Sequence, residues 1–248
     1  MTTDAPLIGR TRARGIETLS LDSPDTRNAL SAALVAELAD ALADCGEDPG
    51  VRAVVLTHTG TTFCAGADLR DPPRPDALVA LLRRLVELPK PVLARISGHV
   101  RAGGLGLLAA CDISAAATTA TFAFTEVRIG VAPAVISLTV LPRADPRALA
   151  RHYLTGERFD AAEAVRTGLL TAAGDDVDAV LEPVLDGLRR SSPQALAETK
   201  RLLTAKVLET FDRDAAGLTA LSARLFASAQ AREGMTAFLE RRDAAWVL

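Results

Sequence analysis

In the first half of the chain, the spacing of apolar residues alternates between the period typical of strands and the period typical of helices. Residues 15–21 alternate apolar and polar positions, as a half-buried strand does, and residues 51–57 and 92–96 are short apolar runs typical of buried strands. Leucines at every fourth position from Leu30 to Leu42 predict an amphipathic helix. Strands that alternate with helices in this way predict an α/β fold.

A proline-rich stretch separates this first unit from a second one. Prolines within residues 72–75 interrupt regular structure, and Asp76 then predicts the N-cap of a helix that runs to Leu88. The order of strand, loop of small residues and helix therefore occurs twice, once through Ala67 and once through Gly103. We expect this repetition to bring the two loop backbones to one place.

Beyond residue 126 the pattern becomes mostly helical. Asp145 before Pro146 predicts a helix start, Asp160 with Glu163 resembles a capping box, and residues 169–170 read as a brief strand. These signals favour short elements that connect the α/β part of the chain to a helical tail.

The tail predicts helices alone. Breaks are expected near residues 192–193 and 211–212, and no linker is long enough to separate two domains. We therefore expect a core over residues 1–190 and a helical region over residues 191–248 that packs on the core and on neighbouring subunits.

Bulk composition narrows the functional classes. The chain has 248 residues, a net charge of −3 and 4% aromatic residues, so no basic field indicates nucleic acid or an anionic membrane as a partner. Cys45, Cys64 and Cys111 are odd in number and show no paired spacing, which fits a reducing compartment. Residues 103–124 are apolar, but the central Asp112 would cost about 3 kcal/mol inside a bilayer. We expect a cytoplasmic protein without a secretory signal.

Most of the candidate functional residues lie in the segment 96–130. It opens with a turn that contains Gly103, Gly104 and Gly106, and glycine lets a backbone approach a ligand closely. If a helix begins at Gly103 or Gly104, its first amide groups point outward and can hold a developing negative oxygen. The segment also contains Glu126, a lone carboxylate after an apolar run.

Each of these features has an ordinary alternative. A glutamate in such a place is most often a surface or ion-paired group, and a glycine pair is often a tight turn. Cys64 is more often a buried thiol than a nucleophile. His58 and His152 have no metal-type spacing, and the glycine spacing does not match a dinucleotide-binding motif. Each motif therefore indicates a function only together with the other motifs of the chain.

Six segments supply that context. They are FCAGADL at 63–69, PKPVLARISG at 89–98, GGLGL…ACDI at 103–113, TEVRIGVAP at 125–133, YLTGERFDAAEAVRTGLL at 153–170, and FLERRDAAW at 238–246. In this order they resemble the enoyl-CoA hydratase/isomerase (crotonase) family and, within it, bacterial methylglutaconyl-CoA hydratase-like proteins. The resemblance implies a repeated ββα core, C-terminal helices that build a trimer or a dimer of trimers, an acyl-CoA thioester substrate, and no separate cofactor or metal.

The resemblance also implies an oxyanion hole at the main-chain amides of Ala67 and Gly103. A thioester carbonyl becomes enolate-like when its neighbouring carbons react, so two fixed donors facing its oxygen act most strongly in the transition state. The implied contacts to substrate and CoA come from the same two loops: Ala65, Ala67, Asp68, Leu69, Gly103 and Gly104.

By the same resemblance, Glu126 matches the second of two catalytic glutamates, and Gly106 stands where the first would fall. A single carboxylate can hydrate a 2-enoyl-CoA if one water supplies both the hydroxyl and the proton. It can equally move a double bond from Δ3 to Δ2, because one group removes and returns the proton. A non-catalytic acyl-CoA-binding protein is the third alternative. We favour the hydratase.

Further departures from the family pattern concern the substrate pocket. Residues 134–136, Ala-Val-Ile, replace a stretch that is usually rich in glycine, and the segment 68–91 is several residues shorter than usual. One wall of the acyl pocket is therefore expected to be thin or open. His99 and Arg101 flank the glycine turn, where they either meet CoA phosphates or an acidic substrate group, or belong to a solvated loop.

Overall fold

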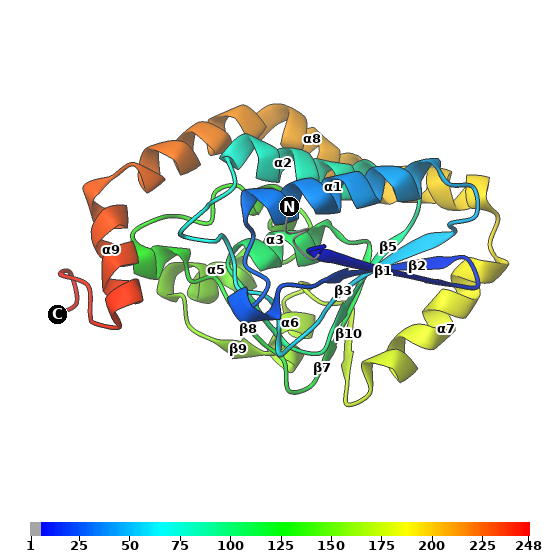
Figure 1. Ribbon diagram of the computed structural model, residues 1–248, viewed down its shortest axis with the longest axis horizontal. Coiled ribbons are helices and arrows are strands. Elements are labelled where there is room, and N and C mark those ends of the chain that lie inside the picture. Colours follow the sequence, from blue (N-terminus) through cyan, green and yellow to red (C-terminus); the bar gives the residue numbers. More distant parts are fainter. Residues whose placement is uncertain (1–5) are drawn as a thin grey trace, which may run out of the picture.

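Two β-sheets form the core of the computed structural model, which describes residues 6–248 (Figure 1). The larger sheet has the strand order β1-β2-β3-β5-β7-β10 and is parallel beyond the β1–β2 hairpin. Its strands are β1 (Ile8–Ala13), β2 (Ile16–Leu21), β3 (Ala53–His58), β5 (Val92–Ile96), β7 (Ile113–Ala117) and β10 (Ala172–Gly174). The smaller sheet contains β4 (Thr62–Cys64), β6 (His99–Arg101), β8 (Thr121–Ala123) and β9 (Phe159–Asp160).

Helices cover both faces of the larger sheet. Those up to η2 are η1 (Pro24–Thr26), α1 (Ala32–Glu47), α2 (Pro75–Glu87), α3 (Gly103–Ala110) and η2 (Glu126–Ile129). Those after it are α4 (Ser137–Val140), α5 (Pro146–Thr155), α6 (Ala161–Arg166), α7 (Val177–Arg190), α8 (Pro193–Phe226) and α9 (Ala229–Glu240). Figure 1 shows α1, α2 and α8 on one side of the sheet and α7 on the other, and each side has its own apolar cluster.

The repeated ββα core expected from the sequence is confirmed. In β3-β4-α2 and again in β5-β6-α3, the first strand joins the larger sheet and the second joins the smaller one. Strands β7 and β8 continue the alternation. The strands β4, β6 and β8 thus become parallel neighbours in the smaller sheet, and their carboxyl ends meet at one edge. The loops that leave this edge hold Ala67, Gly103 and Glu126.

Several local predictions need correction. Helix α2 begins at Pro75 with Arg74 as its N-cap, and Asp76 lies in the first turn, where a carboxylate favours the helix dipole. The brief strand lies at Ala172–Gly174, just beyond residues 169–170. The expected break at 211–212 is wrong, since α8 continues through it with Phe211 buried in the core.

The expected start of the helical tail coincides with a gap between two helices. Helix α7 ends at Arg190 and α8 begins at Pro193, where a proline fits the first turn. Helix α8 packs on α2 and α4 of the same chain. The division into residues 1–190 and 191–248, and the contact of the tail with other subunits, stay predictions. No helix in the part of the chain described here combines the length and apolarity needed to cross a membrane.

A buried ion pair ties α8 to the core. Lys200 is 4% exposed, and its Nζ donates to Asp112 Oδ2 at 2.8 Å and to the carbonyls of Leu85 and Lys90 at 2.9 and 3.0 Å. The same Oδ2 accepts a hydrogen bond from Val92 N at 2.8 Å. The pair therefore joins the tail to the end of α2, the start of β5 and the segment that follows α3.

We predict that Lys200→Ala lowers the free energy of unfolding by about 3–5 kcal/mol, because it leaves Asp112 buried without its closest cation. Urea unfolding followed by circular dichroism measures this difference. Lys206→Ala, at an exposed position of the same helix, is the matched control and should change stability by less than about 0.5 kcal/mol. Equal effects of the two substitutions would contradict an anchoring role.

Candidate active site

The loops that follow β4 and β6 pack backbone to backbone. A Cβ atom placed on Gly103 would lie 3.7 Å from Ala67 N, and one placed on Gly66 would lie 3.5 Å from Gly103 N. Gly66 has φ +95°, a conformation that other residues rarely adopt. The expected convergence of the two loops is therefore confirmed, and it depends on the absence of a side chain at Gly66.

The amides of Ala67 and Gly103 are free to bind a ligand. Leu30 bridges the first loop, since its N–H donates to Gly66 O at 2.7 Å and its carbonyl accepts from Asp68 N at 2.9 Å. Ala67 N takes no part in these hydrogen bonds. Gly103 is the first residue of α3, so its N–H has no partner within the helix. Within residues 6–248 neither amide donates a hydrogen bond.

Ala102, which precedes this helix, has an unusual backbone conformation that sequence analysis missed. Its φ is +45° and its ψ is −119°, a combination that costs a non-glycine residue about 1–3 kcal/mol. The conformation is held by hydrogen bonds from Ala102 N to Ala123 O and from Leu105 N to Ala102 O. It turns the chain sharply from β6 into α3. No signal in the sequence marks it, because alanine is not a turn residue.

Glu126 is the buried carboxylate of this site. It is the first residue of η2 and is 8% exposed, and its Oε2 has no hydrogen-bond partner among the described residues. Burial raises the pKa of Glu126 to about 7, against a smaller opposing effect of its own main-chain N–H. Ala67, Gly103 and Glu126 line one cavity of about 800 Å³. A group that titrates near neutral pH can both take up and release a proton there.

The two C-terminal helices form part of the wall of this cavity. Helix α9 packs on η2 through glycines, because a Cβ on Gly130 would lie 2.7 Å from the Gln230 carbonyl, and one on Gly234 would lie 2.5 Å from the carbonyl carbon of Ile129. In Figure 1, α8 crosses the top of the molecule and α9 turns down from its end. Side chains of both helices line the cavity, so the tail docks on its own core.

Comparison with known proteins decides the family. The family model for enoyl-CoA hydratase/isomerase matches residues 11–247. The chain belongs to this family. It is 51% identical to an enoyl-CoA hydratase from Mycobacterium avium, whose crystal structure matches with a TM-score of 0.92 over 98% of this chain and 100% of that one.

Two further relatives cover most of the chain. A Thermus thermophilus protein that carries the name of an enoyl-CoA hydratase is 34% identical over 237 residues, which are 90% of this chain and 93% of that protein. Carnitinyl-CoA dehydratase from Proteus mirabilis is 32% identical over 243 residues, 91% of this chain and 92% of that protein. The family and the crotonase fold expected from the motifs are confirmed.

The family resemblance makes the surroundings of Gly106 informative. A Cβ at Gly106 would lie 2.6 Å from Ile136 Cγ2 and 3.4 Å from Leu82 Cδ1. Ile136 itself lines the cavity. The family pattern has a glutamate at the position of Gly106. In this chain the space for that side chain is occupied by Ile136, which comes from another segment. Gly106 is a close-packing glycine, and the space for a side chain on α3 is filled.

The remaining site residues expected from the sequence divide into two groups. Ala65, Asp68 and Leu69 line the cavity with Ala67 and Gly103. Gly104 is not among the lining residues, and a Cβ there would lie 2.7 Å from Cβ of Cys64. Direct contact of these residues with substrate stays a prediction.

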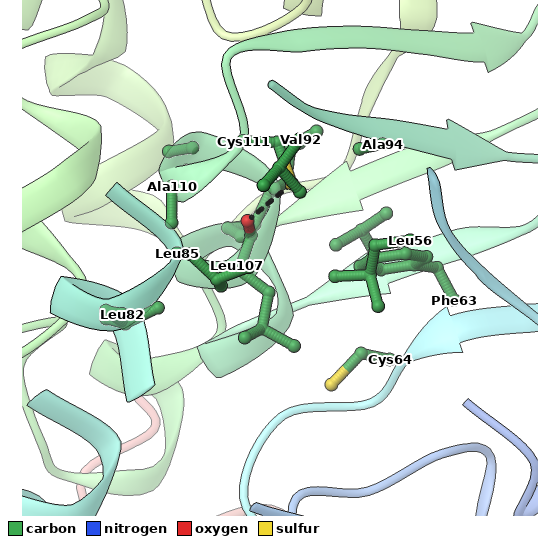
Figure 2. Packing of buried hydrophobic residues seen from close by; sticks show 14 of the residues in the cluster. Leu56, Phe63, Cys64, Leu82, Leu85, Val92, Ala94, Leu107, Ala110 and Cys111 are labelled. Carbon is green, nitrogen blue, oxygen red and sulfur yellow. Dashed lines mark hydrogen bonds between the residues drawn. The ribbon is translucent and has the colours of Figure 1, made fainter. Parts of the chain in front are cut away.

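The cysteine near the site belongs to the apolar core. Figure 2 shows Cys64 within the cluster that also contains Phe63, Leu82 and Leu107. Its thiol is fully buried, and burial raises its pKa to about 12. A thiol that stays protonated at neutral pH and does not reach the cavity is a poor nucleophile.

The histidines also have structural surroundings. His58 Nε2 accepts a hydrogen bond from Ser97 N at 3.2 Å, and the His152 ring stacks on Phe159 with centroids 4.2 Å apart. Within residues 6–248 no group of His, Cys, Asp and Glu side chains is arranged to hold a metal ion.

We predict that Gly106→Ala lowers the free energy of unfolding by about 1–3 kcal/mol, because the added methyl group overpacks against Ile136. In the double variant Gly106→Ala/Ile136→Ala the loss should be smaller than the sum of the single losses by about 1 kcal/mol or more. Urea titration of the four proteins measures the coupling. Gly217→Ala is the control, since a Cβ there meets no atom within 4 Å. If Gly106→Ala behaves like the control, the close packing is refuted.

We also predict that Glu126→Gln stabilises the protein above neutral pH. The folded-state pKa of about 7 exceeds the ordinary value of 4.5, so burial of the ionised form destabilises the native state increasingly as pH rises from about 4.5 to about 7. The advantage of the variant should grow over this window to about 3 kcal/mol and then stay constant. Unfolding at pH 4.5, 6 and 8 measures it. Glu209→Gln, exposed on α8, should show no such growth.

Proposed function

We propose that this protein hydrates a 2-enoyl-CoA, with Glu126 as the acid/base group and the amides of Ala67 and Gly103 as the oxyanion hole. One observation carries the proposal. Two main-chain N–H groups without hydrogen-bond partners in residues 6–248 and one buried carboxylate line the same cavity, and they come from separate loops. Membership of the enoyl-CoA hydratase/isomerase family supports the substrate class.

The reaction follows from this arrangement. The thioester oxygen accepts hydrogen bonds from Ala67 N and Gly103 N, which stabilise the negative charge that develops as water adds to the β-carbon. The Glu126 carboxylate removes one proton from that water, and the hydroxyl forms the new carbon–oxygen bond. The carboxyl group then delivers the proton to the α-carbon, which returns Glu126 to its ionised form and neutralises the enolate.

The surroundings of Glu126 fit a mechanism in which this residue alone carries the proton. Ile136 occupies the place beside Gly106, so the wall there is apolar. Because the pKa of Glu126 is raised to about 7, both of its protonation states are populated at neutral pH. One residue is thereby able to act first as base and then as acid.

The same observation supports a second candidate function. In a Δ3-Δ2-enoyl-CoA isomerase, Glu126 would remove a proton from the α-carbon and return it to the γ-carbon with no water involved. The apolar Ile136 favours this candidate because it offers no polar group to orient a water molecule. A non-catalytic acyl-CoA-binding role is the remaining alternative.

The assembly is part of the proposal. Leu154 of α5 and Leu202 and Leu203 of α8 are 78%, 81% and 70% exposed. Leu202 and Leu203 are adjacent in the sequence, and contiguous exposed apolar side chains mark surfaces that a partner covers. We propose that neighbouring copies cover them in a trimer or a dimer of trimers.

We predict that the protein removes the 2-enoyl absorbance of crotonyl-CoA and that Glu126→Gln lowers kcat/KM about 100-fold or more. Since the base must be ionised, kcat/KM for hydration should rise as pH increases through about 7. Spectrophotometric assays with crotonyl-CoA, 3-methylglutaconyl-CoA and 3-hexenoyl-CoA measure this.

The three substrates separate the candidates. Appearance of 2-enoyl absorbance from 3-hexenoyl-CoA without hydration of the other two indicates the isomerase. No turnover of any substrate, together with tight binding of CoA, indicates the non-catalytic protein. A Glu126→Gln variant with unchanged hydration would exclude the proposed mechanism whichever acyl group is preferred.

A further inference from the structure

The cavity that holds Glu126 has an exposed part and a buried part. All the arginines that line it are exposed, except Arg101, which is half-buried. The lining residues that are buried have apolar side chains or are glycines, and Glu126 and Ser222 are the exceptions among residues 6–248. The apolar members of this buried part include Leu78, Val131, Val135 and Ile136.

The buried part of the cavity favours an uncharged acyl group. Within the described residues no buried lysine or arginine lines it, and the buried Lys200 is paired with Asp112 in the core instead. A carboxylate at the far end of an acyl group would lose its water there and would lie in the same cavity as the Glu126 carboxylate. No buried cation would offset that cost.

Ile136 lies between this buried part and the apolar core. It lines the cavity and is 3% exposed. On its other side, the place that a Cβ on Gly106 would take lies 2.6 Å from Ile136 Cγ2 and 3.4 Å from Leu82 Cδ1. Neither Gly106 nor Leu82 lines the cavity, and Leu82 belongs to the apolar cluster of Figure 2. The cavity therefore ends at Ile136 on the side of α3.

The Ile136 residue is held in this place. Its carbonyl accepts a hydrogen bond from Val140 N at 3.0 Å. The buried Thr139 Oγ1 lies 3.1 Å from the carbonyl oxygens of both Gly106 and Ile136, and this hydroxyl joins the segment to α3. Branching at Cβ restricts the rotamers of isoleucine, and a retreat of the side chain toward α3 would overpack the interior. A longer acyl group therefore does not displace Ile136 readily.

This end wall comes from residues that depart from the family pattern. Residues 134–136 replace a stretch that is usually rich in glycine, and Gly106 stands where a glutamate is usual. With a glycine at position 136, no side chain from this segment would fill the space beside Gly106. The end of the cavity is therefore set by side chains of this chain and not by the arrangement of its strands and helices.

We propose that Ile136 sets the length of the acyl group, so that the cavity takes a short, uncharged acyl chain. The inference rests on the proposed function in so far as the ligand is an acyl-CoA thioester. It holds for a hydratase and for an isomerase alike, because it concerns binding and not the proton transfer by Glu126. Butyryl-CoA, octanoyl-CoA and succinyl-CoA are suitable probes, since they share the CoA part and have no double bond that could react.

Isothermal titration calorimetry with these probes, on wild type, Ile136→Ala and Ile136→Val, is the test. We expect the wild type to bind octanoyl-CoA no more tightly than butyryl-CoA, and succinyl-CoA about tenfold more weakly or worse. In Ile136→Ala the affinity ratio of octanoyl-CoA to butyryl-CoA should rise about tenfold or more, because each methylene group that becomes buried adds about fourfold. Ile136→Val frees the space of one methyl group and should raise the ratio about fourfold.

Val140→Ala is the matched control for loss of core packing. Val140 lies on α4 and is fully buried, but it does not line the cavity, so its substitution should leave the ratio unchanged. A ratio of two affinities does not depend on the fraction of folded protein, so a less stable variant still reports on the pocket.

The outcomes separate this inference from the proposed function. Binding of octanoyl-CoA about tenfold more tightly than butyryl-CoA by the wild type would overturn the length limit, as would equal ratios in the wild type and both Ile136 variants. Tighter binding of succinyl-CoA than of butyryl-CoA would overturn the preference for an uncharged group. Failure of the wild type to bind any probe would refute the proposed function and this inference with it. The expected order of affinities without hydration of crotonyl-CoA would refute the hydratase alone.

Discussion

The parallel pairing of β4, β6 and β8 is the constraint on which the site depends. Parallel strands deliver their carboxyl ends to the same edge of a sheet, so three loops far apart in the sequence begin side by side. The alternation of strands between two sheets produces this pairing, because each ββα unit adds one strand to each sheet. A loop's chemistry is then set by the few residues after its strand, while the sheets fix where that loop begins.

The sequence predicts those parts of the site that follow from local residue patterns. The repeated order of strand, loop and helix predicted that the loops through Ala67 and Gly103 meet. The burial of Glu126 was not predicted, because a glutamate after an apolar run is most often a surface or ion-paired group. The conformation of Ala102 and the contact of Gly106 with Ile136 were not predicted either, since both depend on residues that only the fold brings together. The continuity of α8 was missed for the same reason, because burial against the core holds the helix through Phe211.

The acidity of Glu126 is a property of the whole chain. Helix α9 covers η2 through the close contacts of Gly130 and Gly234, and α8 is tied to the core through Lys200. The contact of α9 lies beside Glu126, whose pKa is raised by its burial. The buried group destabilises the native state at neutral pH, and the large apolar core offsets this cost. Residues of the two C-terminal helices therefore line the same cavity as residues of the core.

The packing of Ile136 against Gly106 also bears on how the chain can evolve. A carboxylate acquired first at position 106 would be forced against Ile136, and a smaller residue acquired first at position 136 would leave an empty space. Either order passes through a less stable intermediate, so selection acting on single substitutions does not readily reach a site with two glutamates. The contact between Gly106 and Ile136 thus disfavours a second carboxylate at this point of α3.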